Sequence, residues 1–210
     1  MLGGEYMQLR ALIERRKPEI KSLLERVGYD YRHWTRPVMY RECFRLIEAL
    51  VPETLEVLEI SSGDFFRTIP FRSYTETRYP DFDICSDTLP RTFDLIIADQ
   101  VFEHLLWPTR AARNVLHMLR PGGHFLVTTP FLIRLHPIPH DCTRWTETGI
   151  RYFLAECGFD LEATKTGSWG NRACVRANFR HWARRGWSGS LRNEPDFPVS
   201  VWALARKPSV

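Results

Sequence analysis

Four polar residues follow the end of a predicted buried strand and are candidates for a small-molecule site. The apolar run 93–98 is followed by Asp99 and Gln100 and then, after two apolar residues, by Glu103 and His104. A helical pattern at 109–119 and another apolar run at 124–129 come next, which is the order of a strand–helix–strand unit in an open α/β sheet. Ligands bind at the carboxyl ends of the strands in such sheets. These four residues should therefore lie at a binding edge.

A second polar cluster follows the apolar run 124–129 and should overhang the same edge. It contains His136, His140 and Asp141. A histidine has a pKa near neutrality and suits a general base, so these three are our catalytic candidates. Two other interpretations stay open. Asp141 could bond to His140 and Arg144 and hold the loop, or the imidazoles and the carboxylate could bind a metal ion. Three ligands on one proline-rich loop are a weak metal signal, and we predict no metal.

The rest of the chain supplies the elements that must position these clusters. We predict strands at 55–60, 72–78, 82–84, 93–98, 124–129, 159–166 and 199–206, and helices at 5–28, 40–50, 109–119 and 146–157. Strands that alternate with helices favour a mainly parallel sheet, and the last two strands favour an antiparallel hairpin at one edge. We expect a linker at 29–37 and a turn at 121–123. The helix at 146–157 should have Thr146 as its N-cap and Gly158 after its end.

Length and composition indicate one soluble domain. The chain has 210 residues, of which 44% are hydrophobic and 26% charged, with a net charge of +4. We divide it into an N-terminal helical segment at 1–52, a core at 53–167 and 198–207, and an insertion at 168–197. No apolar run is long enough to span a bilayer and no signal-peptide pattern is visible, so we expect a cytoplasmic protein. The five cysteines include no CxxC pair, so we expect free thiols, most of them buried.

Residues 55–206 resemble class I S-adenosylmethionine-dependent methyltransferases, on four segments. LEVLEISSG at 55–63 resembles the family's first motif, an acid-containing strand that enters a glycine loop. DFDICSDTLPRTFDLIIADQVFEHL at 81–105 resembles the adenine-side and fourth-strand motifs, and LRPGGHFLVTTPF at 119–131 resembles the Pro-Gly-Gly turn and fifth strand. LHPIPHDCTRWTETGIRYFLAECGF at 135–159 resembles a PHDxxRxT module of a type-11-like bacterial subset. The four segments occur in the family's order.

The resemblance implies S-adenosylmethionine as the cofactor and a Rossmann-like fold. The expected sheet has seven mixed strands, the last one antiparallel, with helices on both faces. The implied cofactor-binding residues are Glu59, Ser61, Gly63, Glu76, Asp83, Ile84, Asp99, Gln100 and His104.

Within that set, the resemblance assigns particular roles. Glu59 would lie near the methionine end of the cofactor, and Asp83 and Ile84 would flank the adenine. Gly63 is the one glycine left of the family's G-x-G-x-G pattern, and its lack of a Cβ would permit close approach of the nucleotide. Glu76 is the nearest candidate for the acid that holds the ribose hydroxyls.

A basic segment and several aromatic residues suggest an anionic acceptor. No Asp or Glu occurs from 163 to 193, whereas Arg172, Arg176, Arg180 and Arg184 recur at a spacing of four, which on a helix would form one stripe. The stripe is either a solvated face or a clamp for a phosphate-bearing acceptor. The substrate-binding candidates are Arg144, Trp145, Trp169, Arg176 and Arg180.

The leading hypothesis is O-methylation of a small-molecule or glycan-like acceptor. The main alternative is a non-catalytic scaffold with the methyltransferase fold in a glycan or secondary-metabolite pathway. Methylation of nucleic-acid bases is disfavoured because the loop ADQVF at 98–102 lacks the Asn/Asp-Pro-Pro-aromatic pattern of base-amine methyltransferases. A nicotinamide dehydrogenase is disfavoured because no G-x-G-x-x-G follows the first strand. The oligomeric state and the identity of the acceptor do not follow from the sequence.

Overall fold

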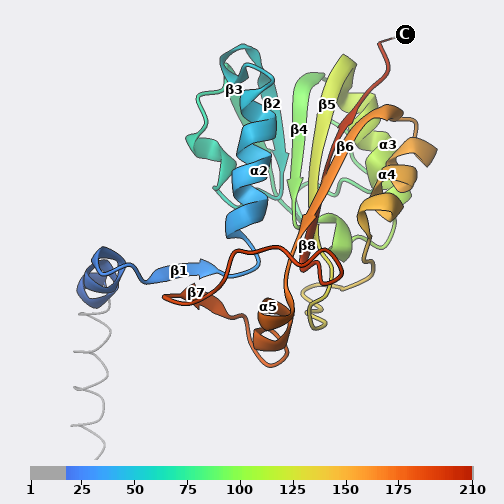
Figure 1. The fold of residues 1–210 in the computed structure, drawn as a ribbon. Coiled ribbons are helices and arrows are strands. Elements are labelled where there is room, and N and C mark those ends of the chain that lie inside the picture. Colours follow the sequence, from blue (N-terminus) through green and yellow to red (C-terminus); the bar gives the residue numbers. More distant parts are fainter. Residues whose placement is uncertain (1–17, 210) are drawn as a thin grey trace, which may run out of the picture.

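The structure is a computed structural model that describes residues 18–209 (Figure 1). The strands are β1 (Asp30–His33), β2 (Glu56–Ile60), β3 (Ser73–Thr77), β4 (Phe93–Asp99), β5 (Leu119–Pro130), β6 (Asp160–Trp169), β7 (Arg184–Gly186) and β8 (Ser200–Arg206). The α-helices are α2 (Pro37–Glu48), α3 (Pro108–Met118), α4 (Glu147–Glu156) and α5 (Arg172–Ala177). Residues 18–26 are also helical, and the beginning of the helix predicted at 5–28 lies outside the described residues.

Six strands form one mixed sheet in the order β3-β2-β4-β5-β8-β6. The pairs β2–β3, β2–β4 and β4–β5 are parallel, and β8 runs antiparallel to both β5 and β6. The predicted mixed sheet with an antiparallel last strand is confirmed. The carboxyl ends of β2 and β4 are neighbours, with Ile60 paired to Ala98, so the loops after these strands share one edge.

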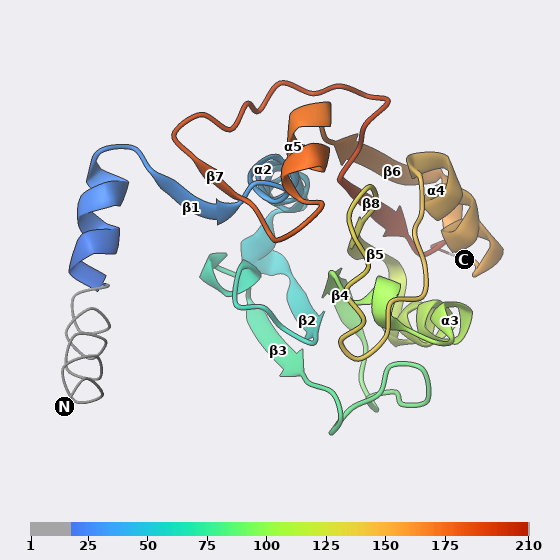
Figure 2. The same ribbon diagram turned by 90° about the horizontal axis from the view of Figure 1, so that it is seen from below.

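Helices cover both faces of the sheet, as predicted. Figure 2 shows α2 on one face and α3 and α4 on the other. The two faces have separate hydrophobic clusters. One is built around Val115 of α3 and Phe125 of β5, and the other around Met39 of α2 and Leu126 of β5. Adjacent residues of β5 thus point into opposite clusters, as the alternation of side chains along a buried strand requires.

The ends of α4 have the predicted caps. The Thr146 side chain accepts a hydrogen bond from the Gly149 N–H at 3.0 Å, and Gly158 has a φ of +106° just after the helix. All five cysteines are free, and Cys43, Cys157 and Cys174 are buried. No helix among residues 18–209 is long and apolar enough to cross a bilayer.

The strand predicted at 82–84 is wrong, so the sheet has six strands rather than seven. Residues 84–86 form a turn. The Asp83 side chain accepts the Cys85 N–H at 2.9 Å, and the Asp87 side chain accepts the Asp83 N–H at 2.7 Å. These short-range bonds satisfy the backbone locally and replace the strand ladder.

Two other local predictions need correction. Residues 121–123 lie within β5, which begins immediately after α3 ends at Met118. The helix that would carry the arginine stripe stops at Ala177. Asn178 is buried there, donates to the Cys174 carbonyl at 2.8 Å and accepts the Ala183 N–H at 3.0 Å, so the chain turns out of the helix. Arg180 and Arg184 are therefore not on α5.

The predicted linker at 29–37 contains a strand. β1 pairs antiparallel with β7, which lies in the basic insertion, and together they form a small second sheet. Figure 1 shows this pair beside the lower end of α2, away from the main sheet. The basic insertion and the segment before α2 therefore pack together through this β1–β7 sheet.

Candidate active site

A cavity of about 330 Å³ opens at the carboxyl ends of β2 and β4. Its lining includes Ser61 from the loop after β2, Gln100 and His104 from the loop after β4, and the Asp83–Ile84 turn. The other lining residues are Ile60, Tyr79, Phe82, Cys85, Val101, Leu105, Leu106, Trp107, Pro139 and His140. The cavity therefore has an apolar wall with a few polar groups, which is the usual composition of a small-ligand site.

The backbone turns sharply where β2 and β4 end. Ser61 and Gln100 each have a φ of +56°, which is uncommon for residues other than glycine. The Ser61 N–H is held by the Thr77 carbonyl at 2.8 Å and the Gln100 N–H by the Thr128 carbonyl at 3.0 Å. Such strained positions concentrate at functional sites. Gly63 does not have a positive φ, and a Cβ there would meet only Phe65 at 3.8 Å.

Glu59 braces the loop after β2. Its side chain accepts from Ser62 Oγ at 3.1 Å and from the Gly63 N–H at 3.4 Å, and the residue is 1% exposed. Burial, helped by the nearby carboxylates of Asp99 and Glu76, raises the pKa of Glu59 to about 7. Glu76 lies beside Glu59 in the β2–β3 register and is bonded to Arg67 at 2.5 Å. Neither glutamate lines the cavity.

Asp99 lies behind the cavity and is held from three sides. Its carboxylate accepts hydrogen bonds from Thr128 and from the Tyr40 hydroxyl, the latter at 2.7 Å, and Arg36 Nη1 lies 3.9 Å away. The Gln100 side chain donates to the same Thr128 hydroxyl at 2.9 Å. Burial and the charge of Asp99 raise the pKa of Tyr40, so its hydroxyl remains a donor.

A second, larger opening has Tyr40 in its wall. This basic cleft has a volume of about 830 Å³ and includes Arg36, Tyr40 and Arg184 in its lining. The rest of the lining is Lys21, Glu25, Gly28, Tyr29, Asp30, Tyr31, Arg32, His33, Phe65 and Arg185. Five cationic side chains, Lys21, Arg32, Arg36, Arg184 and Arg185, thus face two carboxylates, Glu25 and Asp30. The excess of positive charge and the aromatic rings suit an anionic, ring-bearing ligand.

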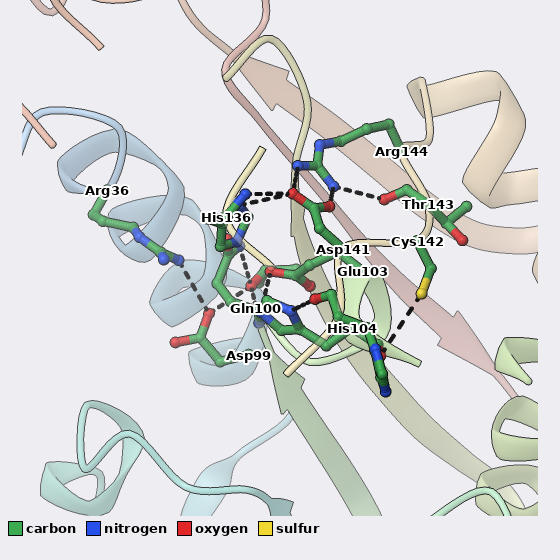
Figure 3. A network of polar contacts seen from close by, with 12 residues as sticks. Arg36, Asp99, Gln100, Glu103, His104, His136, Asp141, Cys142, Thr143 and Arg144 are labelled. Carbon is green, nitrogen blue, oxygen red and sulfur yellow. Dashed lines mark hydrogen bonds and ion pairs between the residues drawn. The ribbon is translucent and has the colours of Figure 1, made fainter. Parts of the chain in front are cut away.

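A polar network covers the end of β4 (Figure 3). The Asp141 carboxylate accepts hydrogen bonds from the Arg144 guanidinium and, at 2.8 Å, from the backbone N–H of His136. The ring atom His136 Nδ1 lies 3.1 Å from the same carboxylate. His104 Nδ1 is 2.5 Å from the His140 carbonyl oxygen. Asp141 thus holds the loop through Arg144 and the backbone of His136. The predicted bond between Asp141 and the His140 side chain is not present.

Glu103 lies at the centre of that network and is fully buried, with 0% exposure. Burial raises its pKa to about 8, and burial also lowers the pKa of His136. The Glu103 carbonyl accepts the Cys142 N–H at 2.7 Å, which ties the loop after β5 to the loop after β4. The two predicted polar clusters are therefore in direct contact.

Comparison with known proteins identifies the family. A methyltransferase-domain profile matches residues 8–163, about three quarters of the chain. The chain belongs to this methyltransferase family. This confirms the resemblance to class I S-adenosylmethionine-dependent methyltransferases. No curated protein sequence matches the chain.

Solved structures share the fold of this methyltransferase domain at low sequence identity. A putative sarcosine dimethylglycine methyltransferase from Galdieria sulphuraria is 13% identical with a TM-score of 0.54, over 81% of this chain and 85% of that one. The N-methyltransferase NodS from Bradyrhizobium japonicum WM9, solved with S-adenosyl-L-homocysteine, is 18% identical with a TM-score of 0.52, over 89% and 97%. A possible histamine N-methyltransferase from Thermotoga maritima is 12% identical with a TM-score of 0.52, over 94% and 99%.

The methyltransferase domain brings together only some of the predicted site residues. Ser61, Asp83, Ile84, Gln100, His104 and His140 line the cavity at the sheet edge. Trp145 and Trp169 lie in the hydrophobic core, where the Trp169 Nε1–H donates to the Leu191 carbonyl at 3.0 Å. Arg144 is occupied by Asp141, and Arg176 and Arg180 are exposed and line neither opening.

Sequence reasoning missed the wall of the basic cleft. The sequence pattern puts Arg36 in a linker and Tyr40 at a helix start, yet both side chains lie beside Asp99. The segment YDYRHWTRP at 29–37 alternates aromatic and basic residues, which was the available signal. Arg184 was identified as part of a helical stripe and instead lines the cleft from β7.

Proposed function

We propose that this methyltransferase domain binds S-adenosylmethionine in the cavity beside Ser61 and Gln100 and methylates a hydroxyl of a small-molecule or glycan-like acceptor held in the basic cleft. The relationship that carries this proposal is the position of Tyr40 and Asp99. Tyr40 lines the cleft, and its partner Asp99 directly precedes Gln100, which lines the cavity. A cofactor and an acceptor in the two openings would meet at this pair.

The cavity offers suitable groups for a nucleoside. Ile84 is 3% exposed and presents an apolar surface on which an adenine ring can lie. The Asp83 carboxylate already orders the turn through the Cys85 N–H and retains acceptor capacity for an exocyclic amine. The positive charge of the sulfonium would lie close to Asp99 and Glu59, whose carboxylates favour a cation.

Methyl transfer to a hydroxyl is an in-line displacement that needs positioning and a proton acceptor. The acceptor oxygen forms a bond to the methyl carbon while the carbon–sulfur bond breaks, and the bonding electrons stay on sulfur to give S-adenosylhomocysteine. The hydroxyl proton must pass to a base. Of His136, His140 and Asp141, we favour His140 as the base, because it lines the cavity and its ring has no role in the loop network.

The proposal is tested by incubating the protein with methyl-labelled S-adenosylmethionine and fractions of a cell extract. We expect label in an anionic glycan or small-molecule fraction, attached as a methyl ether. Label on nitrogen would overturn the assignment to a hydroxyl. No labelled fraction, together with no binding of S-adenosylhomocysteine, would support the scaffold alternative.

A further inference from the structure

The Glu103 side chain has no partner among the described residues. Both of its carboxylate oxygens are buried and neither makes a hydrogen bond. His104 Nε2 is 3.6 Å from Glu103 Oε1, which is too long for a hydrogen bond. A buried carboxylate without a partner is costly, and protonation would not remove the deficit because the new hydroxyl would also lack an acceptor. A positively charged partner would therefore stabilise this site.

Two histidines lie beside this carboxylate, and a hydrogen bond already orients the ring of His104. His104 Nδ1 lies 2.5 Å from the His140 carbonyl oxygen, which can only accept, so in the neutral ring the proton is on Nδ1 and the lone pair is on Nε2. His136 Nδ1 lies 3.1 Å from the Asp141 carboxylate, which Arg144 holds in place, but it makes no hydrogen bond there. Metal-binding histidines usually have this arrangement, with the second ring nitrogen directed at a carbonyl or carboxylate oxygen.

The three side chains are close enough to share one ion. Glu103, His104 and His136 each offer a ligand atom, and these atoms lie within 4.8 Å of one another. Figure 3 shows them gathered beside Asp141 at the end of β4. His104 also lines the cavity, so one side of the cluster borders the place where methyl transfer would occur.

We propose that Glu103, His104 and His136 bind a divalent transition-metal ion such as Zn²⁺. Two imidazoles and one carboxylate are a known donor set for catalytic zinc, and imidazole favours transition metals over Mg²⁺. With three protein ligands, a four-coordinate ion would keep one position for a further ligand. If the proposed function holds, that position receives the acceptor hydroxyl and orients it toward the methyl group.

Calorimetric titration of Zn²⁺ into tag-free, chelator-treated protein tests this site. We expect one equivalent to bind, and we expect Glu103→Gln and His104→Ala each to weaken binding by about 100-fold or more, since even supporting residues change metal affinity by about 10- to 100-fold. The matched control is His117→Ala, an exposed histidine on α3, which should bind like the wild type. Replacing Zn²⁺ with Co²⁺ gives an independent readout, because visible absorption of the ion should report imidazole ligands in the wild type and change in both variants.

Two results would overturn the site: no stoichiometric Zn²⁺ binding by the wild type, or equal binding by the wild type and Glu103→Gln. Thermal melting and S-adenosylhomocysteine binding, measured on the same samples, show whether each variant is folded. They also separate the two proposals. Cofactor binding without Zn²⁺ binding refutes only the metal site, whereas Zn²⁺ binding without cofactor binding refutes only the proposed function.

Discussion

The Tyr40 hydroxyl donates a hydrogen bond to the Asp99 carboxylate at 2.7 Å, across 59 residues of chain. This bond joins α2 to the carboxyl end of β4. Tyr40 is also stacked on Phe65, with ring centroids 4.2 Å apart, so the loop after β2 packs on the same side chain. One tyrosine thus touches the elements that border both openings, and its removal should affect catalysis more than cofactor binding.

Tyr40→Phe should lower the rate of methyl transfer about tenfold and destabilise the protein by about 1.5–3 kcal/mol, the usual contribution of a hydrogen bond to a charged group. Binding of S-adenosylhomocysteine should stay within a few-fold of the wild type, because Tyr40 does not line the cavity. Initial rates, urea unfolding and calorimetry measure the three quantities. Tyr152→Phe, an exposed tyrosine on α4, is the control. An unchanged rate would place the acceptor elsewhere.

Asp83→Ala should weaken binding of S-adenosylhomocysteine by more than tenfold, or about 1.4 kcal/mol, if the Asp83 carboxylate accepts the adenine amine. The exposed neighbour Asp81 does not line the cavity, so Asp81→Ala is the matched control. Calorimetry on both variants decides between a local loss of contact and a general effect of charge. Equal affinities would refute the adenine-side position of Asp83.

Arg184→Gln should raise the KM for an anionic acceptor about tenfold and leave kcat nearly unchanged, because the guanidinium lies on the wall of the basic cleft. Arg184 Nη1 also donates to the Tyr31 carbonyl at 2.7 Å, and a glutamine can retain a donor there. Arg113→Gln, on the exposed face of α3, removes the same charge elsewhere. A KM that changes equally in both variants would indicate only a long-range charge effect.

Glu59 should make stability fall as the pH rises. Because burial raises its pKa to about 7 in the folded protein, the folded state binds more protons than the unfolded state between about pH 4.5 and pH 7. The contribution is fully present below the unfolded pKa and is lost as the pH passes the folded value, by up to about 3 kcal/mol. Urea unfolding at pH 5 and pH 8 should show a clearly smaller loss for Glu59→Gln than for the wild type, and the loss that remains belongs to Glu103, whose pKa burial also raises. Parallel pH profiles would contradict it.

The parts of the fold that local pattern specifies were predictable. The apolar run of β4 and the cap residue Thr146 gave correct elements because their signals lie within a few residues. The strand at 82–84 and the arginine-bearing helix failed because single side chains redirect the backbone. Asp83 accepts a neighbouring N–H, and Asn178 terminates α5. The spacing of residue types does not predict which side chain will form such a local hydrogen bond with the backbone.

The sequence predicts the position of the site at the carboxyl ends of the strands, but not the contacts that α2 and the loop after β5 make around it. The ends of β2 and β4 follow from strand order, and Ser61 and Gln100, predicted to bind the cofactor, line the cavity there. The Tyr40–Asp99 bond and the burial of Glu103 depend on how α2 and the loop after β5 pack, which are contacts between distant segments. Trp145 and Trp169 show the converse error, because large aromatic residues next to a predicted site can equally fill the core.

The most direct test is a crystal structure of the protein with S-adenosylhomocysteine. It should show the nucleoside in the cavity, with adenine against Ile84 and within hydrogen-bond distance of Asp83, and the sulfur turned toward Asp99. The account is contradicted if saturating nucleotide leaves this cavity empty or binds in the basic cleft instead.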